Sequence, residues 1–178
     1  MNTHDPAHVW REEAGDADAP VVVLIHGAMD RSAGMLKVSR RLDTRYRVVR
    51  YDRRGYAKSV HHPGPFDMAG QVADLEDVVA GRRVVLVGHS YGGNVALTFA
   101  ERHPAQVAAV GVYESPLSFE PWWQGTTARQ VTSDPGLSTA DAAEQFMRRF
   151  VGDARWDSLP ERTRATRRAE GVALVGEL

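Results

Sequence analysis

The sequence predicts an α/β fold with a mostly parallel β-sheet and helices on both faces. Through the first two thirds of the chain, short runs of branched apolar residues alternate with segments whose apolar residues recur at helical spacing. The runs are apolar almost without interruption, which is typical of strands that are buried on both faces. Strands that alternate with helices in this way are joined by crossovers and form a parallel sheet.

The first elements can be placed from their start and stop signals. A short strand is expected within HVWREEA, residues 8–14, and the β-branched run at residues 21–26 predicts a buried strand. Ser32 is a good N-cap residue, so a helix is predicted over residues 32–42. The segment YRVVRYD, residues 46–52, predicts the next strand.

The same alternation continues to residue 113. Asp67 is expected to cap a helix that ends at about residue 80, where a glycine follows. Residues 82–88 predict a strand, residues 91–102 a helix, and residues 107–113 a further strand. We expect about six strands in all, of which five are placed here and the strand at residues 107–113 is the last. Its uncovered apolar edge is expected to invite self-association.

From residue 114 onward the alternation is lost. Proline, glycine and polar residues indicate a connector up to about residue 137. Residues 138–151 and 159–174 have helical periodicity, and Ala142, Phe146 and Phe150 form one apolar stripe of the first helix. The last third of the chain is therefore predicted to be helical.

The composition excludes several classes of function. The sequence is 43% hydrophobic and 25% charged with a net charge of -1, so no nucleic-acid or membrane partner is expected. It has no cysteine, which excludes disulfides and thiolate catalysis. The pair His61-His62 lacks a third ligand in the sequence, so no metal site is expected. No segment has the length of a signal peptide core or a membrane span, and we expect a cytoplasmic protein.

One serine is predicted to stand at a sharp bend between a strand and a helix. The stretch VVLVGHSYGGNVAL, residues 84–97, places Gly88 and Gly92 two positions to either side of Ser90. Small residues there let the strand and the helix approach, while the bend lifts the hydroxyl above the sheet. The helix start presents free N–H groups toward a developing oxyanion. This context is typical of a nucleophile, since a serine that only capped a helix would not require both glycines.

In these residues the sequence resembles the α/β-hydrolase fold family, and the resemblance covers nearly the whole chain. The nucleophile elbow of that family, G-x-S-x-G, is matched by residues 88–92. The resemblance implies that Ser90 is the nucleophile and that the backbone N–H of Tyr91 is one oxyanion donor. It also implies that Gly88 and Gly92 serve as scaffold of the site.

Two further motifs of that family are matched earlier in the chain. Its His-Gly-x turn corresponds to His26-Gly27-Ala28, which implies a second oxyanion donor in the Ala28 N–H. His26 and Gly27 are then scaffold residues, and His26 is not the proton-transferring base. The loop DRRGYAKS resembles the family's D-x-R-G-x-G-x-S, which implies structural roles for Asp52 and Arg54.

The family order of catalytic residues is Ser, then Asp or Glu, then His, and the last of these is missing here. No histidine follows His103, which lies about 18 Å from Ser90 at the rise of an α-helix and is too far away to take its proton. Glu114, just after the strand at residues 107–113, is a candidate for the acid.

The family's sheet usually has eight strands, so we expect this chain to be the front part of a longer enzyme, with the histidine beyond Leu178. Residues 1–114 are then the front of the hydrolase core and residues 115–178 a helical cap. Five aromatic residues of that segment are expected to form the interior of the cap more than a substrate pocket: Phe119, Trp122, Trp123, Phe146 and Phe150.

We therefore expect a serine hydrolase that forms an acyl-enzyme on Ser90 with a small ester or amide substrate, without a cofactor. The serine disfavours the aspartate-nucleophile dehalogenases and epoxide hydrolases of the family, while haloperoxidase and C–C bond hydrolase chemistry stay open. The alternative, from another class, is a catalytically incompetent fragment. Such a protein would bind a ligand or partner through the exposed sheet edge and the cap.

Overall fold

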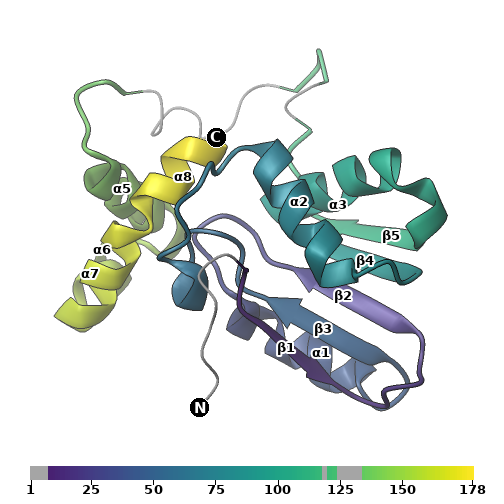
Figure 1. Ribbon diagram of the computed structural model, residues 1–178. Coiled ribbons are helices and arrows are strands. Elements are labelled where there is room, and N and C mark those ends of the chain that lie inside the picture. Colours follow the sequence, from purple (N-terminus) through teal and green to yellow (C-terminus); the bar gives the residue numbers. More distant parts are fainter. Residues whose placement is uncertain (1–7, 118–119, 124–133) are drawn as a thin grey trace.

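The computed structural model describes residues 8–117, 120–123 and 134–178, and within them five strands form one sheet (Figure 1). The strands are β1 (Arg11–Ala14), β2 (Val21–Ile25), β3 (Arg47–Tyr51), β4 (Val84–His89) and β5 (Val107–Tyr113). Their order across the sheet is β1-β3-β2-β4-β5, and only β1 runs antiparallel to its neighbour. The predicted α/β fold is confirmed, but these residues hold five strands and not the six or so that the sequence predicts.

Helices cover both faces of the sheet, as predicted. Those that accompany the strands, including three short 3-10 turns, are η1 (Ser32–Met35), α1 (Leu36–Leu42), η2 (Ala57–Ser59), α2 (Met68–Val79), α3 (Tyr91–Arg102) and η3 (Pro104–Gln106). The C-terminal helices are α5 (Thr139–Val151), α6 (Asp153–Asp157), α7 (Glu161–Ala169) and α8 (Gly171–Glu177). In the part of the chain that the structure describes, none of these helices is long and apolar enough to cross a bilayer.

The two faces of the sheet follow from the alternation of side chains along each strand. In β2, Val23 and Ile25 are buried under α2 and α3, and Leu24 is buried on the opposite face beneath η1 and α1. The helices contribute these residues to the two cores: Val72, Leu75, Val95 and Phe99 to the first, Met35 and Leu42 to the second. Every residue of β2 is buried, which agrees with its unbroken apolar sequence.

The helix starts were predicted with mixed success. Asp67 caps α2 as expected, because its side chain accepts the N–H of Gly70 at 2.8 Å. The prediction for Ser32 is wrong, since the N-cap residue of η1 is Arg31 and it makes no side-chain cap bond. The Ser32 N–H instead donates to Oδ1 of Asp52 at 2.7 Å. A carboxylate from a distant loop thus does what a local cap would do.

Strand β5 lies at one edge of the sheet. Val112 and Tyr113 remain 48% and 65% exposed, so the uncovered edge expected from the sequence is present in the described residues. The unpaired backbone groups of such an edge can accept a further strand. Self-association through this edge stays a prediction.

Charged side chains hold the loop that follows β3. Asp52 accepts the N–H of Lys58 at 3.1 Å in addition to that of the serine in η1. Arg54 makes a bidentate ion pair with Asp74 of α2, from Nε at 2.6 Å and from Nη2 at 2.7 Å. Its Nη1 donates to the Pro65 carbonyl at 2.6 Å. Arg54 and Asp74 are buried, so these charge-assisted bonds tie the loop firmly to α2.

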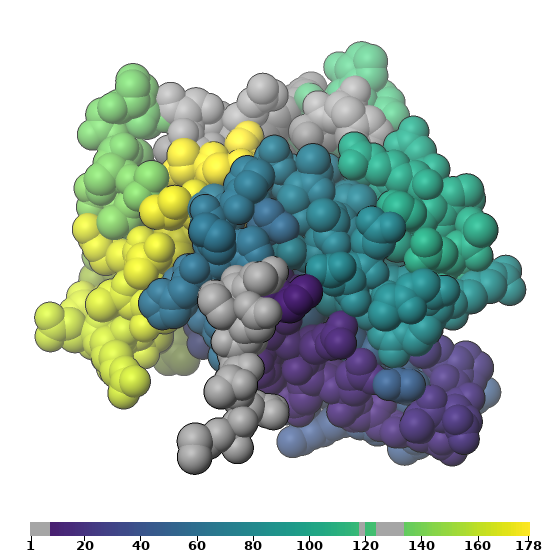
Figure 2. Space-filling view, viewed as in Figure 1, coloured from purple at the N-terminus to yellow at the C-terminus, as the bar shows by residue number. Residues whose placement is uncertain are grey.

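The C-terminal helices lie beyond the carboxyl ends of the parallel strands and pack on the loops there (Figure 1). Ala143, Phe146 and Leu174 form one buried cluster with Met29 and Tyr56, which belong to those loops. In Figure 2 the yellow surface of α8 meets the blue surface of the segment that follows β3. The helices are therefore packed directly over the end of the sheet where Ser90 lies.

The apolar stripe predicted for α5 is present in two of its three residues. Ala142 and Phe146 are buried, but Phe150 is 73% exposed and stacks on Phe146 with ring centroids 5.0 Å apart. Helical periodicity shows which residues share a face, but it does not show how far the neighbouring helices extend along that face. The placement of Phe150 in an interior is therefore wrong.

The remaining aromatic residues of this segment are less buried than the sequence suggests. Trp122 is 62% exposed and contacts the half-buried ring of Trp123 edge-on. The expected burial of Trp122 is therefore wrong, and Phe119 lies outside the described residues.

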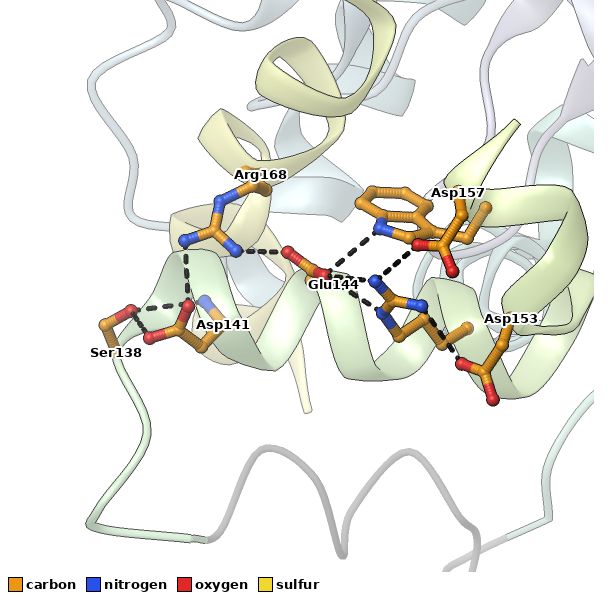
Figure 3. Close-up of polar contacts among 8 residues, drawn as sticks. Ser138, Asp141, Glu144, Asp153, Asp157 and Arg168 are labelled. Carbon is orange, nitrogen blue, oxygen red and sulfur yellow. Dashed lines mark hydrogen bonds and ion pairs between the residues drawn. The ribbon is translucent and has the colours of Figure 1, made fainter. Parts of the chain in front are cut away.

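Polar contacts tie α5 to α6 and α7 (Figure 3). Glu144 of α5 accepts hydrogen bonds from Nε1 of Trp156 at 3.1 Å and from Nε of Arg148 at 2.9 Å. Arg168 of α7 bridges Glu144 and Asp141, the latter at 2.8 Å. Each partly exposed pair contributes little alone, but together they link three helices into one unit.

Glu170, at the junction of α7 and α8, is a buried carboxyl group. Its Oε1 accepts the N–H of Ala57 at 2.9 Å and pairs with Arg167 at 2.8 Å, while Oε2 has no partner among the described residues. Burial raises the pKa of Glu170 to about 7, although the Ala57 N–H favours the carboxylate. The folded chain therefore retains a proton that the unfolded chain releases near pH 4.5.

Asp74→Asn is expected to lower the free energy of unfolding by about 3 kcal/mol, because it leaves the buried Arg54 guanidinium without a counter-charge. Asp153→Asn is the control, since Asp153 is 78% exposed and its ion pair with Arg148 is solvated. Urea unfolding followed by circular dichroism measures both. Equal losses in the two variants would contradict a special role for the buried pair.

Glu170→Gln is expected to remove a pH dependence of stability between about pH 4.5 and about pH 7. Because the pKa is higher in the folded state, the wild-type free energy of unfolding falls as pH rises through this window, by about 3 kcal/mol from this group. Glutamine does not titrate, so the variant lacks this slope. Urea unfolding at both ends of the window measures the difference. Parallel pH profiles for the two proteins would refute the assignment.

Candidate active site

Ser90 lies at the corner between β4 and α3 in a strained backbone conformation. Its φ is 52° and its ψ is -127°, a conformation that costs about 1–3 kcal/mol for a residue with a side chain. The Ser90 N–H donates to the Tyr113 carbonyl at 2.8 Å, and the Ser90 carbonyl accepts the N–H of Gly93 at 2.8 Å. Ser90 is only half-buried, and in the described part of the chain no hydrogen bond involves its hydroxyl.

Glycines permit the close backbone contacts around this corner. A Cβ atom on Gly92 would lie 2.5 Å from the carbonyl oxygen of His26, and one on Gly88 would lie 2.5 Å from Cα of Gly93. Both contacts are with backbone, which cannot rotate away as a side chain can. The glycine spacing seen in the sequence is therefore a steric requirement of this corner.

The loop after β2 lies against the serine. A Cβ atom on Gly27 would stand 2.9 Å from Cβ of Ser90. The next residue, Ala28, makes no hydrogen bond through its N–H within the described residues. Tyr91 is the first residue of α3, so its N–H has no acceptor in that helix. The fold thus brings together the residues singled out in the two motifs: His26, Gly27, Ala28, Gly88, Ser90, Tyr91 and Gly92.

His26 is fully buried and held in one tautomer. Its Nε2 accepts the backbone N–H of Arg53 at 2.9 Å, so its Nδ1 carries the proton and donates to the Gly27 carbonyl at 2.8 Å. Burial and the nearby Arg53 charge lower the pKa of His26 well below its usual value. A neutral imidazole with both nitrogens engaged has no free position for proton transfer, which agrees with a scaffold role.

A buried ion pair lies beside this loop, and neither of its residues was identified from the sequence as part of the site. Arg53 and Glu177 are both fully enclosed, with Nη1 of Arg53 2.6 Å from Oε2 of Glu177. The Tyr56 hydroxyl donates to Oε1 of Glu177 at 2.6 Å. Burial alone would lower the pKa of Arg53, but the Glu177 carboxylate raises it, so the guanidinium stays charged. The only sequence signal is the first of the two arginines in DRRG, which a surface position would explain equally well.

Glu114, the candidate acid, lies at the rim of the site. It is the residue after β5, has a positive φ of 52°, and its side chain is 66% exposed. Its carboxylate contacts Nε2 of His89 at 3.6 Å, and the His89 ring stacks on Tyr113. No hydrogen bond connects Ser90 to any histidine or carboxylate among the described residues. The structure therefore brings Glu114 to the site without joining it to the serine.

Three further histidines of the described residues lie elsewhere. His103 ends α3 and stacks on Phe99, with ring centroids 4.5 Å apart. His8 pairs with the exposed Asp77 at 3.3 Å, and His62 lies 3.9 Å from Asp74. Within the described residues no group of three or more His, Asp or Glu side chains is arranged to hold a metal ion.

Comparison with known proteins agrees with the α/β fold described above. Residues 22–177 match the model of the Alpha/beta hydrolase family. Epoxide hydrolase 3 of Xenopus tropicalis is 32% identical over 108 residues, which are 58% of this chain and 29% of that protein. The putative carbamate hydrolase RutD of Caulobacter segnis is 34% identical over 101 residues, 54% of this chain and 38% of that protein. The chain thus matches less than two fifths of the length of these two curated relatives.

A solved structure shows the same fold. A hydrolase from Pseudomonas aeruginosa PA01 superimposes with a TM-score of 0.69 at 22% identity, over 94% of this chain and 67% of that one. At this identity the likeness concerns the fold alone. The helical part of this chain is included in the match, since the aligned share is nearly complete.

Gly92→Ala is expected to lower the free energy of unfolding by about 3 kcal/mol or more, because the new methyl group meets backbone carbonyl oxygens at the end of β2. Gly111→Ala is the matched control, since a Cβ there meets only Cγ2 of Val87, at 3.9 Å. Guanidinium unfolding of both variants provides the comparison. If Gly92→Ala proves as stable as Gly111→Ala, the close packing described for the corner is incorrect.

Proposed function

The chain belongs to the alpha/beta hydrolase family, and we propose that it carries the nucleophile of a serine hydrolase that acts on a small ester, amide or related acyl substrate. The conformation of Ser90 carries this proposal. A strained, half-buried serine at a strand-to-helix corner, with glycines on both sides, is typical of a nucleophile. A serine needed only for packing would not require backbone strain.

In the proposed reaction the Ser90 oxygen adds to the substrate carbonyl carbon while its proton passes to a general base. The carbonyl oxygen becomes an oxyanion, for which we assign the N–H groups of Ala28 and Tyr91 as donors. Collapse of this intermediate releases the alcohol or amine, which takes up the proton, and leaves an acyl group on Ser90. Water then attacks the acyl group by the same steps and regenerates the serine.

The described residues include the proposed nucleophile and donors, but no base bonded to Ser90. His26 is excluded from that role because both of its nitrogens are engaged. Glu114 stays a candidate acid, positioned at the rim of the site but paired with His89 and not with a base on Ser90. The base of the complete reaction therefore has to come from outside these contacts.

Residues 115–178 are proposed to act as a cap that shapes the acyl pocket. Their helices contact Met29 and Tyr56, which follow the proposed oxyanion loop and β3. Phe146 and Leu174 provide apolar side chains in this contact. An apolar cover over a polar reaction centre favours a small acyl group and excludes water from the developing charge.

The relatives named epoxide hydrolases do not transfer that activity to this chain. The aspartate-nucleophile members of the fold form an ester on a carboxylate, whereas the corner here carries the hydroxyl of Ser90. An attacking hydroxyl requires a base and is suited to acyl transfer. The carbamate hydrolase relative is named for an acyl-type substrate, which agrees better with the proposal.

One observation favours a second function, that of a binding protein on a hydrolase fold. The Ser90 hydroxyl has no base within the described residues. A chain without a base would retain the fold, the exposed edge of β5 and the helical segment, and would bind a ligand or partner without turnover.

A fluorophosphonate probe is expected to label this chain on Ser90, and Ser90→Ala is expected to abolish the labelling. Ser115→Ala is the control, because the Ser115 hydroxyl also lies beside α3 but is buried, without a partner, against Gly93. Mass spectrometry of the labelled peptide identifies the site. Labelling that is complete within minutes at micromolar probe would show that a base activates Ser90, because an activated serine reacts far faster than a free one.

An unlabelled chain with a folded circular-dichroism spectrum would reject the serine hydrolase proposal for this polypeptide and support the binding protein. Labelling that persists in Ser90→Ala would reject Ser90 as the nucleophile. Loss of labelling in Ser115→Ala as well would show that the assay reports folding and not the nucleophile.

A further inference from the structure

We propose that Arg53, held by Glu177, is a positioning residue that sets the direction of the Ala28 N–H, the oxyanion donor assigned above. This inference rests on the proposed function, because the direction of that N–H matters to chemistry only if an oxyanion forms beside Ser90. Arg53 does not touch the reacting atoms. It acts through the carbonyl group of Gly27.

The Gly27 carbonyl and the Ala28 N–H belong to one planar peptide unit and point in opposite directions. Nη2 of Arg53 donates to that carbonyl at 3.1 Å, and Nδ1 of His26 donates to it at 2.8 Å. Two donors on one oxygen fix the rotation of the peptide plane. The Ala28 N–H is then directed to the side away from Arg53, in a loop that lies against Ser90.

Arg53 also strengthens this donor electronically. A charged donor on a carbonyl oxygen polarises the whole peptide group, so the N–H at the other end becomes a better donor. Arg53 is fully enclosed, so water does not screen its charge. The peptide beside the serine is therefore both oriented and polarised by one buried cation.

The Arg53 guanidinium is itself fixed by hydrogen bonds, an ion pair and two aromatic rings. Nε donates to the His26 carbonyl at 2.9 Å and Nη1 pairs with Glu177 at 2.6 Å. The rings of Tyr56 and Tyr91 lie with their centroids 5.0 Å from the guanidinium carbon. A planar fork with donors on three nitrogens can contact two carbonyls and a carboxylate at once, which a lysine ammonium on a flexible stem cannot do in this geometry.

The arrangement connects the helical segment to the oxyanion loop. Glu177 belongs to α8, and Arg167 of α7 donates to the Met29 carbonyl at 3.1 Å. Met29 has a positive φ of 53°, so this contact holds a strained residue directly after Ala28. The C-terminal helices thus act on both sides of the proposed donor, through Glu177, which holds Arg53, and through Arg167, which bonds the Met29 carbonyl.

The first test is an NMR comparison of Arg53→Met with Arg54→Met. Both substitutions remove a buried guanidinium from the same loop, but Arg54 bonds to Asp74 and Pro65 and to no atom of the loop after β2. The amide nitrogen of Ala28 reports hydrogen bonding at the preceding carbonyl. We expect its resonance to move in Arg53→Met and to stay in place in Arg54→Met. An unmoved Ala28 resonance in Arg53→Met overturns the inference.

Arg53→Lys and Glu177→Gln keep the test decisive if Arg53→Met does not fold. Lysine preserves the charge but loses the fork, so the Ala28 resonance is expected to move as it does in Arg53→Met. Glutamine preserves the shape of Glu177 but removes its charge, and a smaller displacement is expected. If the Ala28 resonance keeps its wild-type position in both variants, the inference is wrong.

The second readout is the rate at which a fluorophosphonate labels Ser90, because the phosphoryl oxygen of the probe occupies the place of the oxyanion. Arg53→Met is expected to slow labelling on the order of tenfold to a hundredfold, somewhat less than the loss of a whole donor. Arg54→Met is expected to label at the wild-type rate at a temperature where both variants are folded. Equal rates in wild type and Arg53→Met overturn the inference while the serine hydrolase proposal stands. An unlabelled wild type rejects that proposal, and the Ala28 resonance still decides the positioning role.

Discussion

Close backbone packing between the end of β2 and the start of α3 is the constraint on which the candidate site depends. Because Gly88 and Gly92 have no Cβ, the backbone at the corner of Ser90 can lie in contact with neighbouring backbone. Gly27 in the same way allows the loop after β2 to lie against the serine. Hydrogen bonding to an oxyanion tolerates displacements of only a few tenths of an ångström. The glycines therefore matter to the proposed oxyanion donors, because they let the two backbone segments lie in close contact, and the strain at Ser90 belongs to the same corner.

This packing buries polar backbone groups, and three consecutive buried charged residues form hydrogen bonds with them. Asp52 accepts N–H groups of its own loop and of η1, Arg53 donates to the carbonyls of the loop after β2, and Arg54 joins its loop to Asp74. Buried charges are costly unless each has a partner, so these groups specify one arrangement of the loops. Buried charged side chains in this way hold loops that have little regular structure of their own.

Much of the fold could be predicted because its signals are local. The unbroken apolar run of β2 indicates burial on both faces, and Asp67 caps α2 with an N–H three residues away. The corner at Ser90 could also be predicted, since the need for glycine is a property of the backbone at that position. The failures share a cause. Ser32 lost its expected role to a carboxylate twenty residues away, and the exposure of Phe150 depends on where other helices end.

The sequence by itself determined the alternation of strands and helices, the strained corner and the identity of the two motifs that meet there, because each depends on residues a few positions apart. Only the tertiary structure decided that Arg53 pairs with Glu177 across 124 residues of chain and that His26 is locked in one tautomer. Contacts between residues so far apart follow from the path of the whole backbone, and side-chain charge alone does not reveal the partner.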